Sequence, residues 1–220
     1  MTRTRCIGMF GGTFDPIHYG HLRTALELQT RLDLSQIRFI PCNRPPTAKA
    51  PLLRARDRLT MVAAAIESEP AFAVDDREIE RGGVSYSVDT LESLRAELPR
   101  TPIAMIMGMD AFLSLPTWHR WEEILELAHI LVAHRPGWQA PSSGVLARIL
   151  ADRAAQAADL HEQTRGLIYV EAVTQLEISS SDLRRSISLG IDPKYLVPPN
   201  VRTLILATEC YAKEKQEAVG

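Results

Sequence analysis

Two histidines, His18 and His21, stand three residues apart where a segment with helical periodicity begins. They follow a short apolar run and the paired glycines Gly11 and Gly12, so the sequence predicts a strand, a glycine turn and a helix start in succession. Side chains at this spacing share one face of a helix, near its positive end. Their imidazole N–H groups could bind a polyphosphate and stabilise charge that develops on it. Two partly exposed capping histidines are the alternative.

The glycine turn differs from the two commonest phosphate-binding loops. No Gly-Lys-Ser/Thr follows the glycines, and no third glycine stands at the dinucleotide-fold spacing. The histidine pair could also serve a metal, but no third histidine lies nearby in the sequence to complete a catalytic zinc set. We therefore predict a phosphate-binding turn and no protein-borne metal site.

A second group of donors lies near the C-terminal end, at Ser179, Ser180 and Ser181, with Arg184 one turn later. Ser179 and Asp182 have the spacing of a capping box, which predicts a helix start. Free N–H groups, hydroxyls and a guanidinium there suit a triphosphate tail. Alone, the segment would be an ordinary helix cap. Together with the histidine turn, it favours a nucleotide site.

Four further groups have both a functional and a structural interpretation. Asp110 follows a buried strand and could hold a ribose hydroxyl or a metal, or cap the next helix. Trp118 could stack on a flat heteroaromatic ring, although most tryptophans simply pack. The helix start at 85–87 offers backbone N–H groups to a carboxylate, or is a plain cap. Lys49 could reach a phosphate, or be solvated.

The elements that carry these groups alternate between strand and helix along the whole chain. Apolar runs predict strands at 6–10, 37–41, 72–74, 103–107, 129–133 and 167–170. Alternation of this kind predicts an α/β fold, a Rossmann-like open and mostly parallel sheet with helices on both faces. Ligands of such sheets bind beyond the carboxyl ends of the strands. The polar groups described above follow strands, so we expect them to converge.

Helices are predicted between the strands and after the last one. The segment 56–69 is amphipathic, with an expected inward face of Leu59, Val62, Ala63 and Ile66. Further helices are expected at 118–127, at 144–160 and at 201–215. The charged run 75–81 is expected to continue the strand at 72–74 as an edge or irregular segment.

Composition limits the classes of partner. The chain has 220 residues, 45% of them hydrophobic, and a formal net charge of -2, which gives no electrostatic reason to expect nucleic acid or a membrane surface. No run approaches the roughly 18 apolar residues of a membrane span. Three scattered cysteines, Cys6, Cys42 and Cys210, indicate reduced thiols. We expect a soluble, cytoplasmic protein of one domain, and the oligomeric state, including a possible homo-oligomer, is left open.

No local Ser/His/Asp or Cys/His arrangement is present. A reaction at phosphorus that needs only positioning and charge stabilisation therefore suits the residues better than covalent catalysis.

The segment Gly11–His21 closely resembles the first signature of the nucleotidyltransferase superfamily, with its paired His-x-Gly-His histidines. The segment 178–184, Ile-Ser-Ser-Ser-Asp-Leu-Arg, resembles the second signature. Features between them are similar to those of the bacterial nicotinate-nucleotide adenylyltransferases, over nearly the whole chain. They are Pro45-Pro46 with a following lysine, Ser85-Tyr86-Ser87, Gly108-x-Asp110, Pro116-Thr117-Trp118 and Arg135-Pro136-Gly137.

This resemblance implies transfer of AMP from ATP to nicotinate mononucleotide, with Mg²⁺, to give deamido-NAD and pyrophosphate in NAD synthesis. The whole chain, 1–220, would be one nucleotidyltransferase domain, in which 178–215 is a C-terminal helical portion that completes the ATP site. The residues implied as catalytic are His18, His21 and Arg184. Those implied in ATP binding are Gly11, Gly12, Thr13, Phe14, Ile178, Ser179, Ser180 and Ser181. Those implied in nicotinate mononucleotide binding are Lys49, Tyr86, Ser87, Gly108, Asp110, Trp118, His119 and Arg135.

The chain departs from the family pattern at three places. Thr47 and Ala48 separate the paired prolines from Lys49, Ser87 stands where threonine is common, and His119 stands where tyrosine is often found. The alternatives are a sister adenylyltransferase, acting on nicotinamide mononucleotide or phosphopantetheine, and an adenine-nucleotide sensor without catalysis.

Overall fold

The structure is a computed structural model that describes residues 4–46, 50–134, 141–174 and 176–212. Two residues implied in mononucleotide binding, Lys49 and Arg135, lie outside the described residues.

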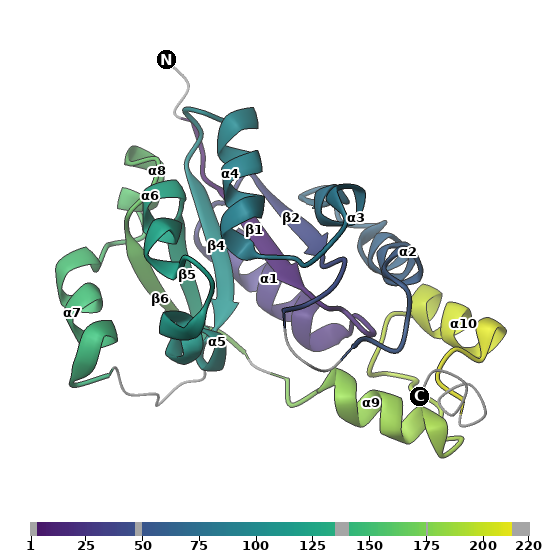
Figure 1. Cartoon of the computed structure of the whole chain (residues 1–220). Coiled ribbons are helices and arrows are strands. Elements are labelled where there is room, and N and C mark those ends of the chain that lie inside the picture. The colour runs from purple at the N-terminus through teal and green to yellow at the C-terminus, as the bar shows by residue number, and fades with distance from the viewer. Residues whose placement is uncertain (1–3, 47–49, 135–140, 175, 213–220) are drawn as a thin grey trace. The chain divides into compact units, whose positions relative to one another are not determined.

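Six strands form one sheet in the order β3-β2-β1-β4-β5-β6. The pairs β1–β4, β4–β5 and β5–β6 are parallel, and helices lie around the sheet (Figure 1). The predicted Rossmann-like α/β fold is therefore confirmed. The strands are β1 Ile7–Gly12, β2 Gln36–Pro41, β3 Phe72–Val74, β4 Ile103–Gly108, β5 His129–His134 and β6 Ile168–Ala172.

The centre of the sheet is buried along its length. In β4 the residues from Ile103 to Met107 are all buried, and in β5 those from His129 to Ala133 are too. The two strands pair in register, with Met105 opposite Ile130. Near-continuous apolar runs of this kind are typical of parallel strands covered on both faces.

Ten α-helices are described, with two short 3₁₀ helices, η1 Leu115–Thr117 and η2 Trp121–Glu123. The α-helices are α1 Tyr19–Arg31, α2 Ala55–Ile66, α3 Arg77–Arg81, α4 Ser87–Glu97, α5 Met109–Ser114, α6 Ile124–Leu127, α7 Gly144–Arg153, α8 Asp159–Glu162, α9 Ser180–Ser188 and α10 Pro199–Thr208.

Three helical expectations were wrong in part. The charged run 75–81 mostly forms the helix α3 instead of a strand edge. The helix expected at 118–127 is broken, because Arg120 has a φ of 51° and separates η1 from η2. The segment 144–160 contains α7 and the start of α8, with an interruption that follows Arg153.

The chain folds into two compact units, each made of three separate segments. The first unit consists of 1–11, 24–38 and 86–175, and the second of 12–23, 39–85 and 176–220. We call them the β4–β6 unit and the histidine unit, after the strands and the residue pair that they contain.

In the histidine unit, α2 and α10 lie side by side (Figure 1). The inward face of α2 differs from the predicted one. Val62 and Ile66 are buried as expected, but Ala63 is exposed. An arginine, Arg58, is fully buried on this helix.

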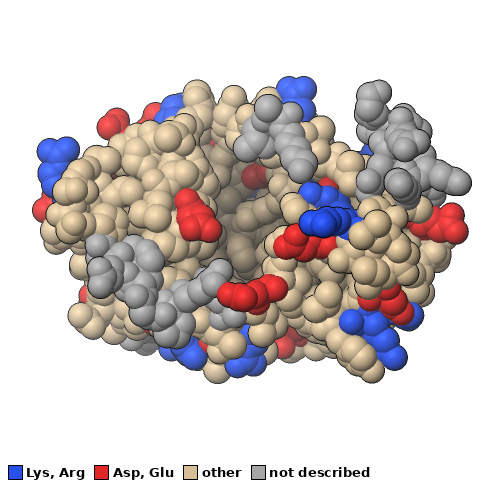
Figure 2. Space-filling view, turned by 90° about the horizontal axis from the view of Figure 1, so that it is seen from below, with Lys and Arg blue, Asp and Glu red and all other residues tan. Residues whose placement is uncertain are grey.

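No helix in the described part of the chain is long and apolar enough to cross a membrane. On the described part of the face in Figure 2, acidic and basic side chains are interspersed, and neither sign gathers into a broad patch. This distribution agrees with the formal net charge of -2.

Candidate active site

The turn between β1 and α1 is shaped by an aromatic side chain. Phe14 is 2% exposed and has a φ of 49°, an uncommon conformation for a residue other than glycine. Its ring contacts the edge of His21, with 5.1 Å between centroids, and lies 5.8 Å from the ring of Phe39. A Cβ at Gly12 would lie 2.9 Å from the Phe14 ring. Glycine is therefore required there by close packing.

The two histidines lie face to face at the start of α1. Their ring centroids are 3.7 Å apart at an angle of 30°, and the backbone N–H of His18 donates to Nδ1 of His21 over 3.3 Å. Because Nδ1 of His21 accepts, the proton of the neutral ring is carried by Nε2. The orientation of the two rings is therefore fixed within the first turn of α1.

Burial keeps both rings neutral near pH 7. It lowers the pKa of His18 from 6.5 to about 4. Burial, and then the neighbouring His18, lower the pKa of His21 well below its usual value. Within the described residues, Nδ1 of His18 is buried without a hydrogen-bond partner. A buried polar atom of this kind costs free energy unless a ligand, ion or water satisfies it.

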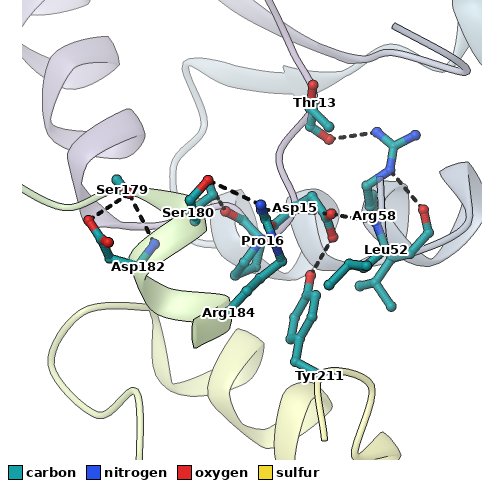
Figure 3. Close-up of polar contacts among 12 residues, drawn as sticks. Thr13, Asp15, Pro16, Leu52, Arg58, Ser179, Ser180, Asp182, Arg184 and Tyr211 are labelled. Carbon is teal, nitrogen blue, oxygen red and sulfur yellow. Dashed lines mark hydrogen bonds and ion pairs between the residues drawn. The ribbon is translucent and has the colours of Figure 1, made fainter. Parts of the chain in front are cut away.

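The second predicted helix start is present and capped as expected. Ser179 is the N-cap of α9, where its hydroxyl accepts from the backbone N–H of Asp182 over 3.1 Å and donates to the Asp182 carboxylate over 2.9 Å (Figure 3). The predicted helix start, with Ser179 as its cap, is confirmed. Further N–H groups of the first turn remain at the exposed end of this helix, where anions are favoured.

A buried carboxylate, Asp15, connects α9 to the histidine turn. It is 2% exposed. Its Oδ1 accepts from the hydroxyl of Tyr211 over 2.7 Å, and its Oδ2 accepts from the N–H of Leu52 over 2.8 Å. Arg184 donates to the backbone oxygen of Asp15 over 2.6 Å and to Ser181 over 3.1 Å, and its guanidinium lies 3.8 Å from Oδ2 of Asp15 (Figure 3).

The hydroxyl of Ser180 adds one more bond to this connection, because it donates to the backbone oxygen of Pro16 over 2.9 Å. The start of α9 is therefore attached to the turn that precedes His18. Arg184, implied as catalytic, also attaches α9 to this turn through its bond to the backbone oxygen of Asp15. Sequence reasoning missed Asp15 and Tyr211. The Asp-Pro pair inside the first signature was the only local signal for the former.

The residues implied in acceptor binding lie mainly at two helix starts of the β4–β6 unit. Tyr86 is the N-cap of α4 without a side-chain cap bond, and Ser87 is the first helical residue. Gly108 is the N-cap of α5, which also lacks a side-chain cap bond, and Asp110 lies exposed in its first turn. The helix start expected at 85–87 is therefore present, and the hydroxyl of Ser85 accepts from the N–H of Asn43.

Two aromatic groups stand near these helix starts. The ring of Tyr86 lies 4.4 Å from that of exposed His119, at 40°. Trp118 follows η1 and is half-buried, and its indole N–H donates to the hydroxyl of Ser114 over 3.2 Å. That bond fixes one edge of the indole.

The predicted site residues thus divide between the two units. The histidine unit contains His18, His21, residues 12–14 and residues 178–184, whereas Gly11 is the last residue of the preceding segment. The β4–β6 unit contains Tyr86, Ser87, Gly108, Asp110, Trp118 and His119. Their roles in binding stay predictions. In the described part of the chain, no group of three or more His, Cys, Asp or Glu side chains could hold a metal ion.

The family model described as cytidylyltransferase-like matches residues 9–186, most of the chain. Together with the parallel sheet and the paired histidines, it defines the class of protein, because the chain belongs to this nucleotidyltransferase family. Two curated relatives define the branch. A protein of Aeromonas hydrophila named "Probable nicotinate-nucleotide adenylyltransferase" is 46% identical over 200 residues, 90% of this chain and 94% of the relative. One of Methylococcus capsulatus with the same name is 44% identical over 209 residues, 94% of this chain and 100% of the relative. The chain thus belongs to the nicotinate-nucleotide adenylyltransferases.

Solved structures share the fold at low sequence identity. Nicotinic acid mononucleotide adenylyltransferase of Plasmodium falciparum, complexed with APC, superposes with a TM-score of 0.70 at 17% identity, over 94% of this chain and 97% of that protein. The same enzyme complexed with NaAD gives a TM-score of 0.67 at 17% identity, with the same coverage of both chains. These matches establish the fold.

Proposed function

We propose that this protein transfers the adenylyl group of ATP to nicotinate mononucleotide. An oxygen of the mononucleotide phosphate attacks the α-phosphorus of ATP and forms a new P–O–P bond. The bond from the α-phosphorus to the bridging oxygen of the β-phosphate breaks, and pyrophosphate leaves with that oxygen. The reaction needs no covalent enzyme intermediate. The observation that carries the proposal is the stacked His18–His21 pair, joined in one unit to the α9 start by Asp15.

The histidine unit supplies groups suited to ATP. Two neutral imidazoles at a helix start offer N–H donors, and donors fixed in advance stabilise charge as it develops on the phosphates. The buried Nδ1 atom of His18, which has no partner among the described residues, indicates that the ring acquires a partner when ligand or water is bound. Arg184 has N–H groups beyond its bonds to Asp15 and Ser181 that could contact a phosphate.

The start of α4 supplies a reason for an acid to be preferred over an amide. Its first turn has no side-chain cap, so backbone N–H groups such as that of Ser87 are available to a ligand. A carboxylate at a helix start gains from the helix dipole, whereas a neutral amide does not. Trp118 and the Tyr86–His119 pair are the aromatic surfaces on which a pyridine ring could stack.

Mg²⁺ is proposed to accompany ATP. The described residues offer no clustered protein ligands, and the carboxylate of Asp15 is already bound by Tyr211, Leu52 and Arg184. This fits a cation that is held mainly by substrate phosphates and water, as Mg²⁺ commonly is. When bound, it would neutralise phosphate charge. We also propose a cytoplasmic location, which is supported by three cysteines that form no disulfide.

Pyrophosphate release from ATP tests the reaction, with nicotinate mononucleotide, nicotinamide mononucleotide and phosphopantetheine as separate acceptors. We expect turnover with both mononucleotides or with the acid alone, and a preference for the acid. Absence of release with any acceptor would contradict the assignment and would favour the sensor. Release only with phosphopantetheine would favour the sister enzyme.

A backbone substitution tests the carboxylate site. Proline at the first helical position is tolerated and removes only one N–H donor, and Tyr86 already has extended angles that suit a following proline. We expect Ser87→Pro to raise KM for the acid about tenfold and for the amide much less. Ala55→Pro, at the first position of α2 after an extended Arg54, is the matched control. Equal changes for both acceptors would exclude this carboxylate site.

A further inference from the structure

Arg58 carries a buried positive charge in the histidine unit. Its side chain is fully buried. The guanidinium donates to the backbone oxygens of Thr13 at 2.5 Å (Figure 3), Cys42 at 2.5 Å, Asn43 at 3.0 Å and Leu53 at 3.3 Å. These acceptors are neutral backbone groups. They belong to the glycine turn, to the segment after β2 and to the residues that precede α2.

No carboxylate lies within ion-pair distance of this guanidinium in the part of the chain that the structure describes. One buried acid, Glu78, is 5% exposed. Burial raises the pKa of the Cys42 thiol, Arg58 opposes that rise, and Glu78 adds a smaller rise, so both charged groups act on this thiol. The positive charge is therefore retained beside Thr13 without a directly paired negative one.

An unpaired buried charge is costly, and an arginine cannot avoid the cost by losing its proton. The other cationic groups beside the histidine turn provide little uncompensated charge. His18 and His21 are kept neutral by burial, and Arg184 faces the carboxylate of Asp15. Arg58 is thus a buried arginine beside the histidine turn whose field can act on a nearby anion.

We propose that Arg58 is a positioning residue that attracts the phosphates of the adenine nucleotide. The hydrogen bond from Arg58 fixes the Thr13 backbone in the glycine turn. The positive charge of Arg58 favours anionic groups that bind at this turn, although the side chain does not contact them. The inference rests on the proposed ATP site. It identifies Arg58 as a source of the positive potential at that site. The fixed hydrogen bonds to four carbonyl groups explain why arginine is suited to the position, since its planar fork has five N–H donors.

A ligand series of rising charge separates an electrostatic role from a structural one. Dissociation constants are measured by calorimetry for adenosine, AMP, ADP and ATP, without acceptor, on the native chain and on Arg58→Gln, Arg58→Met and Arg58→Lys. We expect the neutral variants to lose affinity progressively, by about twofold or less for adenosine and about tenfold or more for ATP. Arg58→Lys keeps the charge, so its ATP-to-adenosine ratio should stay near that of the native chain.

Arg56→Gln is the matched control, because it removes the same charge from the same helix. Arg56 is exposed and paired with Glu80, so its field is screened and we expect a change of less than about twofold. An equal loss for adenosine and ATP in the neutral Arg58 variants, or no loss at all, would overturn the proposal. Normal thermal unfolding verifies that each variant is folded.

A measurement on the unaltered chain covers the case in which the variants do not fold. The preference for ATP over adenosine is measured at about 0.1 M and about 1 M salt, because buried charges are screened far less than exposed ones. We expect the preference to persist within about threefold, and its collapse would overturn the proposal. Since no acceptor is present, these results are independent of whether nicotinate mononucleotide is the substrate.

Discussion

Replacement of Tyr211 by phenylalanine removes one hydroxyl and leaves the buried ring in place. That hydroxyl donates to Oδ1 of Asp15 over 2.7 Å, and both residues are almost fully buried. Burial and the neighbouring Asp15 also raise the pKa of Tyr211, so the hydroxyl stays protonated and acts as the donor. Leu52 and Arg184 remain as the other partners of the carboxylate. The change therefore isolates one donor.

A hydrogen bond to a charged group contributes about 1.5–3 kcal/mol. For a chain of this size, about 1 kcal/mol lowers the melting temperature by roughly 2–4 °C. We expect Tyr211→Phe to lower the free energy of unfolding by about 2 kcal/mol and the melting temperature by roughly 4–8 °C. Urea unfolding followed by fluorescence, with a calorimetric melting scan, measures both quantities.

The matched control is Tyr195→Phe, which removes a hydroxyl from a ring that is 80% exposed, and it should change stability by less than about 0.5 kcal/mol. A double-mutant cycle with Asp15→Asn isolates the pair, and we expect a coupling of at least about 1 kcal/mol. If Tyr211→Phe matched its control, or if the two substitutions were additive, Asp15 would not depend on this donor.

Three further predictions concern the starts of α1 and α9 in the histidine unit. A Cβ at Gly20 would lie 2.9 Å from Nδ1 of His18, so Gly20→Ala should displace that ring and lower kcat about a hundredfold, with circular dichroism showing an intact helix. Because the pKa of His18 falls from 6.5 to about 4 on folding, the unfolded chain binds the extra proton between those values. The contribution of His18 to the free energy of unfolding is therefore complete above about pH 6.5, and it should fall by roughly 3 kcal/mol as the pH is lowered towards 4. Urea unfolding of His18→Asn should show a weaker dependence on pH. Ser179→Ala removes the cap of α9 and should cost about 1 kcal/mol, and an unchanged urea midpoint would contradict the capping role.

Local pattern was sufficient to predict the sheet. Continuous apolar runs such as that at 103–107 identify buried parallel strands, because both faces of such a strand exclude water. The cap at Ser179 was equally predictable, since its bond joins residues three positions apart. Both features depend on interactions that the sequence itself brings close together.

The wrong elements had a different physical cause. The run 77–81 is rich in glutamate and arginine, which have good helix propensity, but its charge was interpreted as a strand edge or an irregular segment. The helix expected from Trp118 onward depended on periodicity alone. A single left-handed residue, Arg120, interrupts it, and its side chain bonds to Glu92 and Glu123. Periodicity does not report such a local reversal.

The connections around the site could not be predicted because they join distant segments. Asp15 meets Tyr211 across 196 positions, and Arg58 meets Thr13 across 45. An arginine on a helix is usually solvent-exposed, so Leu59 was assigned to the inward face in its place. Only the folded chain shows that the polar side chain is the one that is enclosed.

The division into units also bears on the order in which the chain can fold during synthesis. The segments of the β4–β6 unit are complete once residue 175 has been made, whereas the histidine unit still lacks 176–220. Domains fold as the ribosome completes them. The sheet strands β4, β5 and β6 can therefore pair while the residues around His18 still await α9, α10 and Tyr211. A nascent chain passes through a stage in which the turn implied in ATP binding exists without the side chains that hold Asp15.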